Sequence, residues 1–167
     1  MAELSLEERL QPSLLDRLTD DEPQTKTEAR SMRVLSVNRL KKSVLRDLAW
    51  LLNTGSLSII EDLSDYPDVE SSVLNYGVSD TSGKYISSTD VGPIEKRIRK
   101  AITDFEPRII ADSLRVRIRA DRQSMNLKAL TFTIEGQLWA QPLPVSLYVS
   151  TEVDLETGST VVTETNG

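Results

Sequence analysis

The stretch Glu106-Pro107-Arg108 marks a change of hydrophobic period, and this change constrains the fold more than any other feature of the chain. Before it, over residues 94–105, apolar residues recur at helical spacing. After it, over residues 114–120, apolar and arginine side chains alternate as in a half-buried strand. Because Pro107 disfavours the α conformation at the preceding residue and has no backbone N–H, the helix is expected to end here. The tripeptide therefore predicts a corner that holds two opposite charges between a helix and a sheet.

Two helices and three strands are predicted around this corner. Apolar stripes at helical spacing predict helices over residues 36–53 and from about residue 90 to residue 105. Alternation predicts strands over residues 114–120, 130–138 and 145–152, and their short connections favour hairpins in an antiparallel sheet. One face of this sheet is apolar and must be covered by the helices. We therefore expect an α+β fold with two main helices packed on a small antiparallel sheet of about three strands.

The chain divides into three predicted parts. Residues 1–30 are expected to form an acidic, flexible N-terminal arm with a short amphipathic helix, residues 31–162 the folded domain, and residues 163–167 a polar tail. The arm carries leucines at roughly helical spacing, namely Leu6, Leu10, Leu14, Leu15 and Leu18. Such an isolated stripe either docks back on its own domain or lies in a groove of another protein, and the sequence favours neither interpretation.

Two amino acids are absent from the chain, and their absence excludes several kinds of site. Without cysteine, the chain forms no disulfide, no thiolate zinc site and no cysteine nucleophile. Without histidine, it lacks the commonest general base and metal ligand. The sequence shows neither a signal peptide nor an apolar run of the ~20 residues that span a bilayer. We therefore expect a cytoplasmic protein that needs no cofactor and does not insert into a membrane.

The charged residues are distributed unevenly. A formal net charge of −6 argues against a surface devoted to nucleic acid. The first predicted strand nevertheless presents Arg115, Arg117 and Arg119 on the face opposite its apolar residues. Such a row could bind phosphates or a partner's carboxylates. We favour a solvated strand face balanced by Glu135 and neighbouring acids, because surface charges of this kind are common.

Paired carboxylates raise a catalytic alternative, because two of them suffice for glycoside hydrolysis. The candidates lie in one polar stretch and are Glu61, Asp62, Asp65, Asp68 and Glu70. Nothing in their spacing places one acid in an apolar niche, so a solvated or partner-facing role is favoured. Peptidoglycan cleavage by such a pair is the alternative to a non-enzymatic function.

The opposite charges of the corner allow two interpretations. Glu106 and Arg108 can form a local ion pair that holds the helix to the sheet. Alternatively, Arg108 presents its guanidinium fork to carbonyls or a carboxylate of a neighbouring subunit, and Glu106 orients it. Residue chemistry alone leaves these two interpretations nearly even.

An ordered set of motifs resembles the lysozyme-like baseplate wedge family of contractile injection machines. That family has an asparagine-tyrosine-glycine segment, a helix, a glutamate-proline-arginine corner and then a sheet. Here the segment is Asn75-Tyr76-Gly77, and the corner is Glu106-Pro107-Arg108. Residues 13–18, 46–53 and 153–158 are also similar to TssE, the branch of the family found in type VI secretion baseplates.

The resemblance implies a structural subunit rather than an enzyme, at the cytoplasmic face of a baseplate docked on the inner membrane. In the family the corner docks onto wedge proteins, here TssF and TssG with TssK contacted indirectly, and we extend this role to Asn75, Tyr76 and Gly77. Family members also exchange strands with the first sheath ring. If the strand at residues 145–152 is an edge, it is expected to template a sheath of TssB and TssC. The candidate residues on that strand are Val145, Leu147 and Val149.

Overall fold

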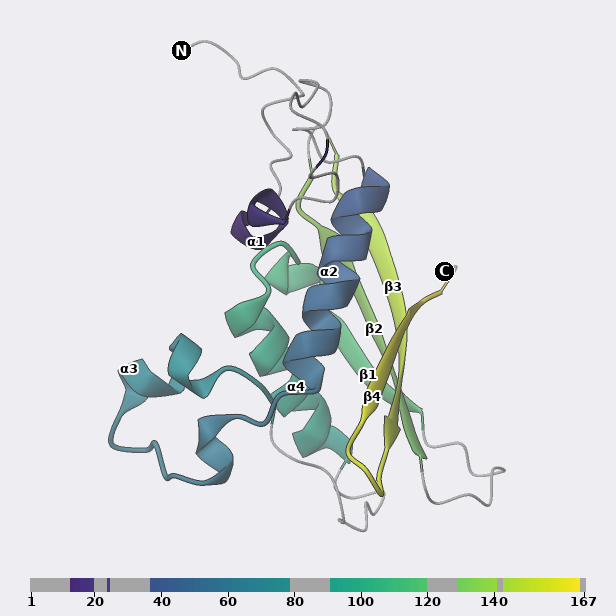
Figure 1. The fold of residues 1–167 in the computed structure, drawn as a ribbon. Helices are drawn as coiled ribbons and strands as arrows, with labels where there is room; N and C mark the ends of the chain where they lie inside the picture. Colours follow the sequence, from purple (N-terminus) through teal and green to yellow (C-terminus); the bar gives the residue numbers. More distant parts are fainter. Residues whose placement is uncertain are drawn as a thin grey trace.

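The structure is a computed structural model that describes residues 13–19, 24, 37–78, 91–119, 129–140 and 143–165. Two long helices, α2 (Val37–Leu52) and α4 (Val91–Phe105), lie on one face of an antiparallel sheet (Figure 1). The sheet contains β1 (Arg115–Arg119), β2 (Ala129–Leu138), β3 (Val145–Asp154) and β4 (Thr160–Glu164), in that spatial order. The shorter helical segments are α1 (Leu14–Leu18), η3 (Leu57–Ile59), α3 (Pro67–Glu70), η4 (Val73–Asn75) and η5 (Ala111–Ser113). The predicted α+β class is confirmed.

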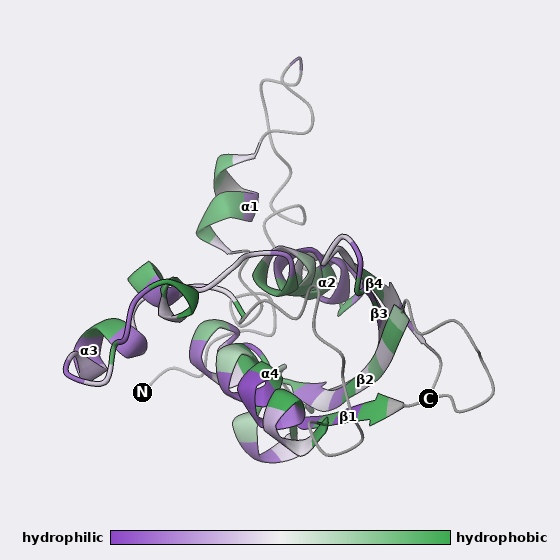
Figure 2. Ribbon diagram, turned by 90° about the horizontal axis from the view of Figure 1, so that it is seen from below, coloured by the Kyte–Doolittle hydropathy of each residue, from purple (hydrophilic) through white to green (hydrophobic). Residues whose placement is uncertain are grey.

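The apolar stripes of the two long helices form the core against the sheet. From α2 the core receives Leu40, Val44, Leu48, Leu51 and Leu52, and from α4 it receives Ile94, Ile98, Ala101 and Ile102. The facing strands contribute alternate residues such as Phe132, Ile134 and Val149. Figure 2 shows both helices on the same side of the curved sheet. Because only one sheet face is covered, the strands keep the alternation of apolar and polar residues that predicted them.

A fourth strand, β4, was not predicted. It pairs with β3 from Val149 to Val153, and it includes Thr163 and Glu164, which the sequence analysis placed in the polar tail. Only five residues long and rich in threonine, it lacks a clear apolar alternation. The tight turn before it fixes its course, since Gly158 has a φ of 73° and donates its N–H to the Asp154 carbonyl.

The connection between α2 and α4 forms a lobe, defined here as residues 56–78, which projects from the helical side of the domain (Figure 1). The sequence predicted one short helical turn near residues 68–74, and the lobe contains η3, α3 and η4. The lobe returns to its starting point through a parallel bridge between Gly55 and Val78. The lobe is therefore a loop-like segment whose two ends meet beside the end of α2.

Some sequence predictions fall outside the described residues. These are Leu6 and Leu10 of the arm, the side chain of Arg119, and most of the loop that joins β1 to β2. Among the described residues, no helix combines the length and apolar character needed to cross a membrane.

Candidate protein-docking site

The corner forms where the sequence predicted it. Helix α4 ends at Phe105, and the Glu106 N–H still donates to the carbonyl of Ile102 at 2.8 Å. The chain then turns and runs beside the end of β2, where the Arg108 carbonyl accepts a hydrogen bond from the Trp139 N–H at 2.7 Å. Pro107 at the turn is exposed. The corner thus links the helical layer directly to the sheet.

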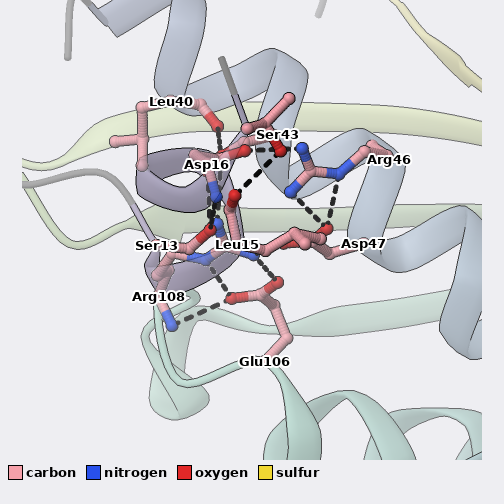
Figure 3. Close-up of polar contacts among 10 residues, drawn as sticks. Ser13, Leu15, Asp16, Leu40, Ser43, Arg46, Asp47, Glu106 and Arg108 are labelled. Carbon is pink, nitrogen blue, oxygen red and sulfur yellow. Dashed lines mark hydrogen bonds and ion pairs between the residues drawn. The ribbon is translucent and has the colours of Figure 1, made fainter.

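The guanidinium group of Arg108 is bound within the domain. Its Nε donates to Glu106 at 2.6 Å, and its two terminal nitrogens donate to Ser43 at 3.0 Å and to Asp47 at 2.5 Å (Figure 3). Glu106 is only 3% exposed. Burial would lower the pKa of Arg108, but hydrogen bonds and charge attraction from Glu106 and Asp47 raise it above its ordinary value. Glu106 and Arg108 therefore bind each other, and α2 completes the site.

Further charges extend this arrangement to the N-terminal arm. Arg46 donates to Asp47 at 2.8 Å and to Asp16 of α1 at 2.5 Å. Asp16 also accepts a hydrogen bond from the hydroxyl of Ser13, the residue that caps α1. Burial alone would raise the pKa of Asp16, but the bonds from Ser13 and Arg46 outweigh it and hold the pKa below its ordinary value. We call the alternating series Asp16, Arg46, Asp47, Arg108 and Glu106 the charge network.

The sequence analysis did not identify three members of the charge network. Asp16, Arg46 and Asp47 come from other elements, 30 and 61 residues distant from their partners along the chain. The sequence held two indirect signals: residues 13–18 and 46–53, which contain all three, resemble segments of TssE, and Arg46 and Asp47 lie off the apolar stripe of α2. No local pattern links them to the corner, so the packing of α1, α2 and α4 had to be known first.

The Asn75-Tyr76-Gly77 segment closes the lobe. The Asn75 side chain accepts from the Ser58 N–H at 2.9 Å and donates to the Glu70 carbonyl at 2.8 Å. Gly77 has a φ of 127°, and a Cβ there would collide with the Thr54 carbonyl and lie 2.9 Å from the nitrogen of Ser56. Only glycine fits this approach without strain. Asn75 thus ties two parts of the lobe together, and Gly77 lets the lobe return close to the backbone that follows α2.

Tyr76 connects the lobe to the corner. Its ring packs edge-on against Phe105, with 5.3 Å between the ring centroids. Burial, together with the negative charges of Asp47 and Glu106, raises the pKa of Tyr76. Because Phe105 directly precedes Glu106, the two predicted motifs form one continuous assembly.

Exposed apolar side chains border the charge network. Helix α1 is held through the carboxylate of Asp16, while Leu14, Leu15 and Leu18 are exposed, and Leu18 is 74% accessible. Trp50 is half exposed, and the guanidinium carbon of Arg46 lies 5.0 Å from its ring centroid. Trp139, joined to the Arg108 carbonyl, is also half exposed. These side chains have the composition of a protein-docking surface.

The candidates on β3 occupy a different position from the one predicted. Leu147 and Val149 are buried in the core, and Val145 is partly buried against it. From Val149 onward β3 lies between β2 and β4, so the condition that this strand is an edge is not met for this part. Among the described residues, the open edges of the sheet belong to β1, to β4 and to the start of β3, before its pairing with β4.

The other charged candidates lie at the surface. Arg115 and Arg117 are exposed on the outer sheet face, with Arg115 opposite Glu135 in register. All five acids of the predicted catalytic stretch are exposed on the lobe. Among the described residues, a cavity of about 300 Å³ between the end of α2 and the sheet has no carboxylate in its lining. The described geometry therefore gives glycoside hydrolysis no support.

Comparison with known proteins identifies the family. The family model described as baseplate wedge protein gp25 matches residues 38–143, which is more than half of the 167-residue chain. This range extends from α2 through the lobe and the corner to the end of β2. A comparison with curated proteins gave no significant match. The chain belongs to the baseplate wedge protein gp25 family, whose members have a structural role in phage-tail-like baseplates.

Proposed function

We propose that this chain is a TssE-type subunit of a type VI secretion baseplate. Its family supplies the structural role, and the motifs outside the matched range, at residues 13–18 and 153–158, support the type VI branch. In this proposal it sits at the cytoplasmic face of the inner-membrane-docked baseplate. It binds TssF and TssG directly and TssK indirectly, and it needs no cofactor.

The observation that carries the docking proposal is the orientation of α1. This helix is fastened by an ion pair on its polar side, with the apolar side chains of Leu14 and Leu18 left in solvent. An isolated amphipathic helix would normally turn its leucines toward the domain. Outward leucines beside exposed Trp50 and Trp139 fit a groove on a wedge protein, where aromatic and leucine side chains act as anchors.

The charge network has a positioning role in this proposal. Since all three donor groups of the Arg108 guanidinium bind Glu106, Ser43 and Asp47, the partner meets the apolar side chains around the corner. Asn75, Tyr76 and Gly77 act in the same way, by fixing the lobe against the corner. In this proposal the geometry of the docking surface thus depends on residues that do not themselves touch the partner.

In this proposal, the backbone at the edge of the sheet templates the assembly of the TssB and TssC sheath. The start of β3, which includes Val145 and Leu147, lies before the residues that pair with β4, and Val145 and Leu147 have no strand partner on that flank among the described residues. Strand addition from TssB or TssC uses main-chain hydrogen bonds at such a flank. Val145, Leu147 and Val149 keep their role through the register that their buried side chains impose on the strand.

Co-purification with TssF and TssG tests the proposal. Wild type should be retained, and Leu18→Ser combined with Trp139→Ala should lose binding while its circular dichroism stays unchanged. Val161→Ser, an exposed apolar position on β4, serves as the matched control and should bind normally. Failure of the folded wild type to bind TssF and TssG would overturn the assignment.

A further inference from the structure

The lobe exposes several large apolar side chains to solvent. Ile60 is 81% accessible and Val73 is 80% accessible, and Ile59, Tyr66 and Leu74 are exposed as well. Leu63 is the lobe's buried apolar side chain. Segments η3 and η4 contact each other, so Ile59 and Val73 lie on neighbouring turns. Figures 1 and 2 show α3 standing well away from α2 and α4. The long helices therefore leave these side chains uncovered.

The charge of the lobe has a single sign. Between Ser56 and Val78 the sequence contains five acidic residues and no lysine or arginine. Among the described residues, the cation paired with an acid of the lobe is Lys100 of α4, whose Nζ lies 3.7 Å from a Glu70 oxygen. Lys100 also binds Asp104 at 2.8 Å, so its charge is shared. The apolar side chains thus stand in an excess of negative charge.

The lobe is nevertheless fixed in place. The bridge between Gly55 and Val78 closes its base, with the Val78 N–H donating to the Thr54 carbonyl at 2.9 Å. Asn75 ties η3 to the end of α3 through its side-chain amide. Ordering a segment costs conformational entropy, which burial within the lobe does little to offset. A rigid arm with uncovered apolar tips is the arrangement expected of a docking element.

We infer that the lobe is a second docking surface, which binds a basic, apolar-grooved surface on another baseplate protein. This inference rests on the proposed function and adds a contact separate from the corner. Charge decides the occupant, because the lobe carries five acids, of which Glu70 alone has a lysine or arginine paired with it among the described residues, and such an excess attracts a rim of lysine and arginine. A second copy of this chain would bring two acidic lobes together, which like-charge repulsion disfavours.

The two parts of the lobe have different roles in this contact. The apolar side chains of Ile60 and Val73 supply affinity by leaving water, so their loss should speed dissociation. The surrounding acids Glu61, Asp62 and Asp65 steer the encounter, so their loss should slow association and reduce its sensitivity to salt.

Binding of the purified TssF–TssG complex to this chain, measured at low and high salt, tests the inference. Ile60→Ser with Val73→Ser should weaken binding roughly tenfold or more, a change of about 1.4 kcal/mol. Asp62→Asn with Asp65→Asn should flatten the salt dependence. Val161→Ser, with its side chain exposed on β4, is the matched control and should leave both quantities unchanged.

The outcomes separate this inference from the proposed function. If TssF–TssG binds wild type and the lobe variants equally, the lobe inference is overturned while the baseplate assignment stands. If the complex binds neither, both fail. Light scattering of the chain alone tests self-association. If it showed a dimer that Ile60→Ser with Val73→Ser abolishes, the lobe would be a self-association surface, and the inference of a basic partner would be overturned.

Discussion

The charge network and the lobe both combine charged and apolar side chains, but they do so in opposite ways. In the network, acids and arginines alternate, Glu106 is buried, and every donor group of the Arg108 guanidinium has a partner within the domain. In the lobe, the charges have one sign, and Ile60 and Val73 lie in solvent. A complete set of internal partners indicates a role in holding structure. An incomplete set indicates that the partner lies in another chain.

This difference changes how the two predicted motifs are understood. Both motifs resemble segments of docking proteins, and both lie mainly inside the domain, where Asn75 is buried and Arg108 is bound by Glu106, Ser43 and Asp47. Buried ion pairs add little net stability but are costly to break. The motifs therefore specify the relative positions of α1, α4 and the lobe, and the exposed side chains around them meet the partner.

Among the substitutions that compare the charge network with the lobe, removal of Arg108 should have the largest effect on stability. Arg108→Ala would leave buried Glu106 and neighbouring Asp47 without their shared cation, which is expected to lower the free energy of unfolding by about 3–5 kcal/mol. Urea unfolding followed by circular dichroism measures this loss. Arg117→Ala, on the exposed face of β1, is the matched control and should change stability by less than about 0.5 kcal/mol. Equal unfolding midpoints for the two variants would contradict the structural role of the network.

The closure of the lobe is tested by a glycine substitution. Gly77→Ala forces a Cβ against the backbone of residues 54–56 at a positive φ, so we expect a loss of about 1–3 kcal/mol from strain. Gly92→Ala is the control with the opposite sign, because nothing lies within 4 Å of its added Cβ and it stands inside α4. There, replacement of glycine should stabilise by about 0.4–1 kcal/mol. If both substitutions changed the unfolding temperature in the same direction, the proposed role of Gly77 in closing the lobe would be refuted.

The sequence was sufficient to predict features that depend on local period. The two long helices, the corner at Pro107 and three of the strands were predicted within a few residues, since each has its own apolar pattern or break. Strand β4 was missed because it is only five residues long and shows no alternation of apolar and polar residues, although four of its residues are β-branched and favour a strand. Its pairing with β3 and the turn at Gly158, which hold it in place, are visible only in the folded structure.

The site was harder to predict, because its residues bind side chains that are distant in the sequence. Residue chemistry left an inward and an outward Arg108 nearly even, because Asp47 lies 61 residues away and enters only when α2 packs beside α4. The lobe raised a different difficulty. Its apolar residues follow no period, so neither their exposure nor their closeness to one another was predictable before the chain was seen to return at Val78.

The attachment of α1 gives a smaller, pH-dependent effect. Because the pKa of Asp16 is lowered in the folded protein from its ordinary value of 3.8, its ion pair with Arg46 stabilises the docked helix above that pH. This contribution is lost as the pH falls through the lowered folded value. The pair is partly exposed, so the effect should be about 0.2–1 kcal/mol. Amide chemical shifts of α1 followed by NMR should report a shift of the helix toward the released state, and Asp16→Asn should give the same shift already at neutral pH. A helix that stays docked in this variant would show that other contacts hold it.

The smallest expected effect is the stability change caused by substitution of an exposed apolar residue of the lobe. Ile60→Ser removes an apolar side chain that is almost fully in solvent, so the free energy of unfolding should change by less than about 0.5 kcal/mol. Leu63→Ala, at the lobe's buried position, should destabilise the domain more than this, since burial rather than residue type sets the cost. Thermal unfolding of the two variants makes the test. If Ile60→Ser proved as costly as Leu63→Ala, the apolar tips of the lobe would be part of the chain's own core, and a surface kept for a partner would lose its physical basis.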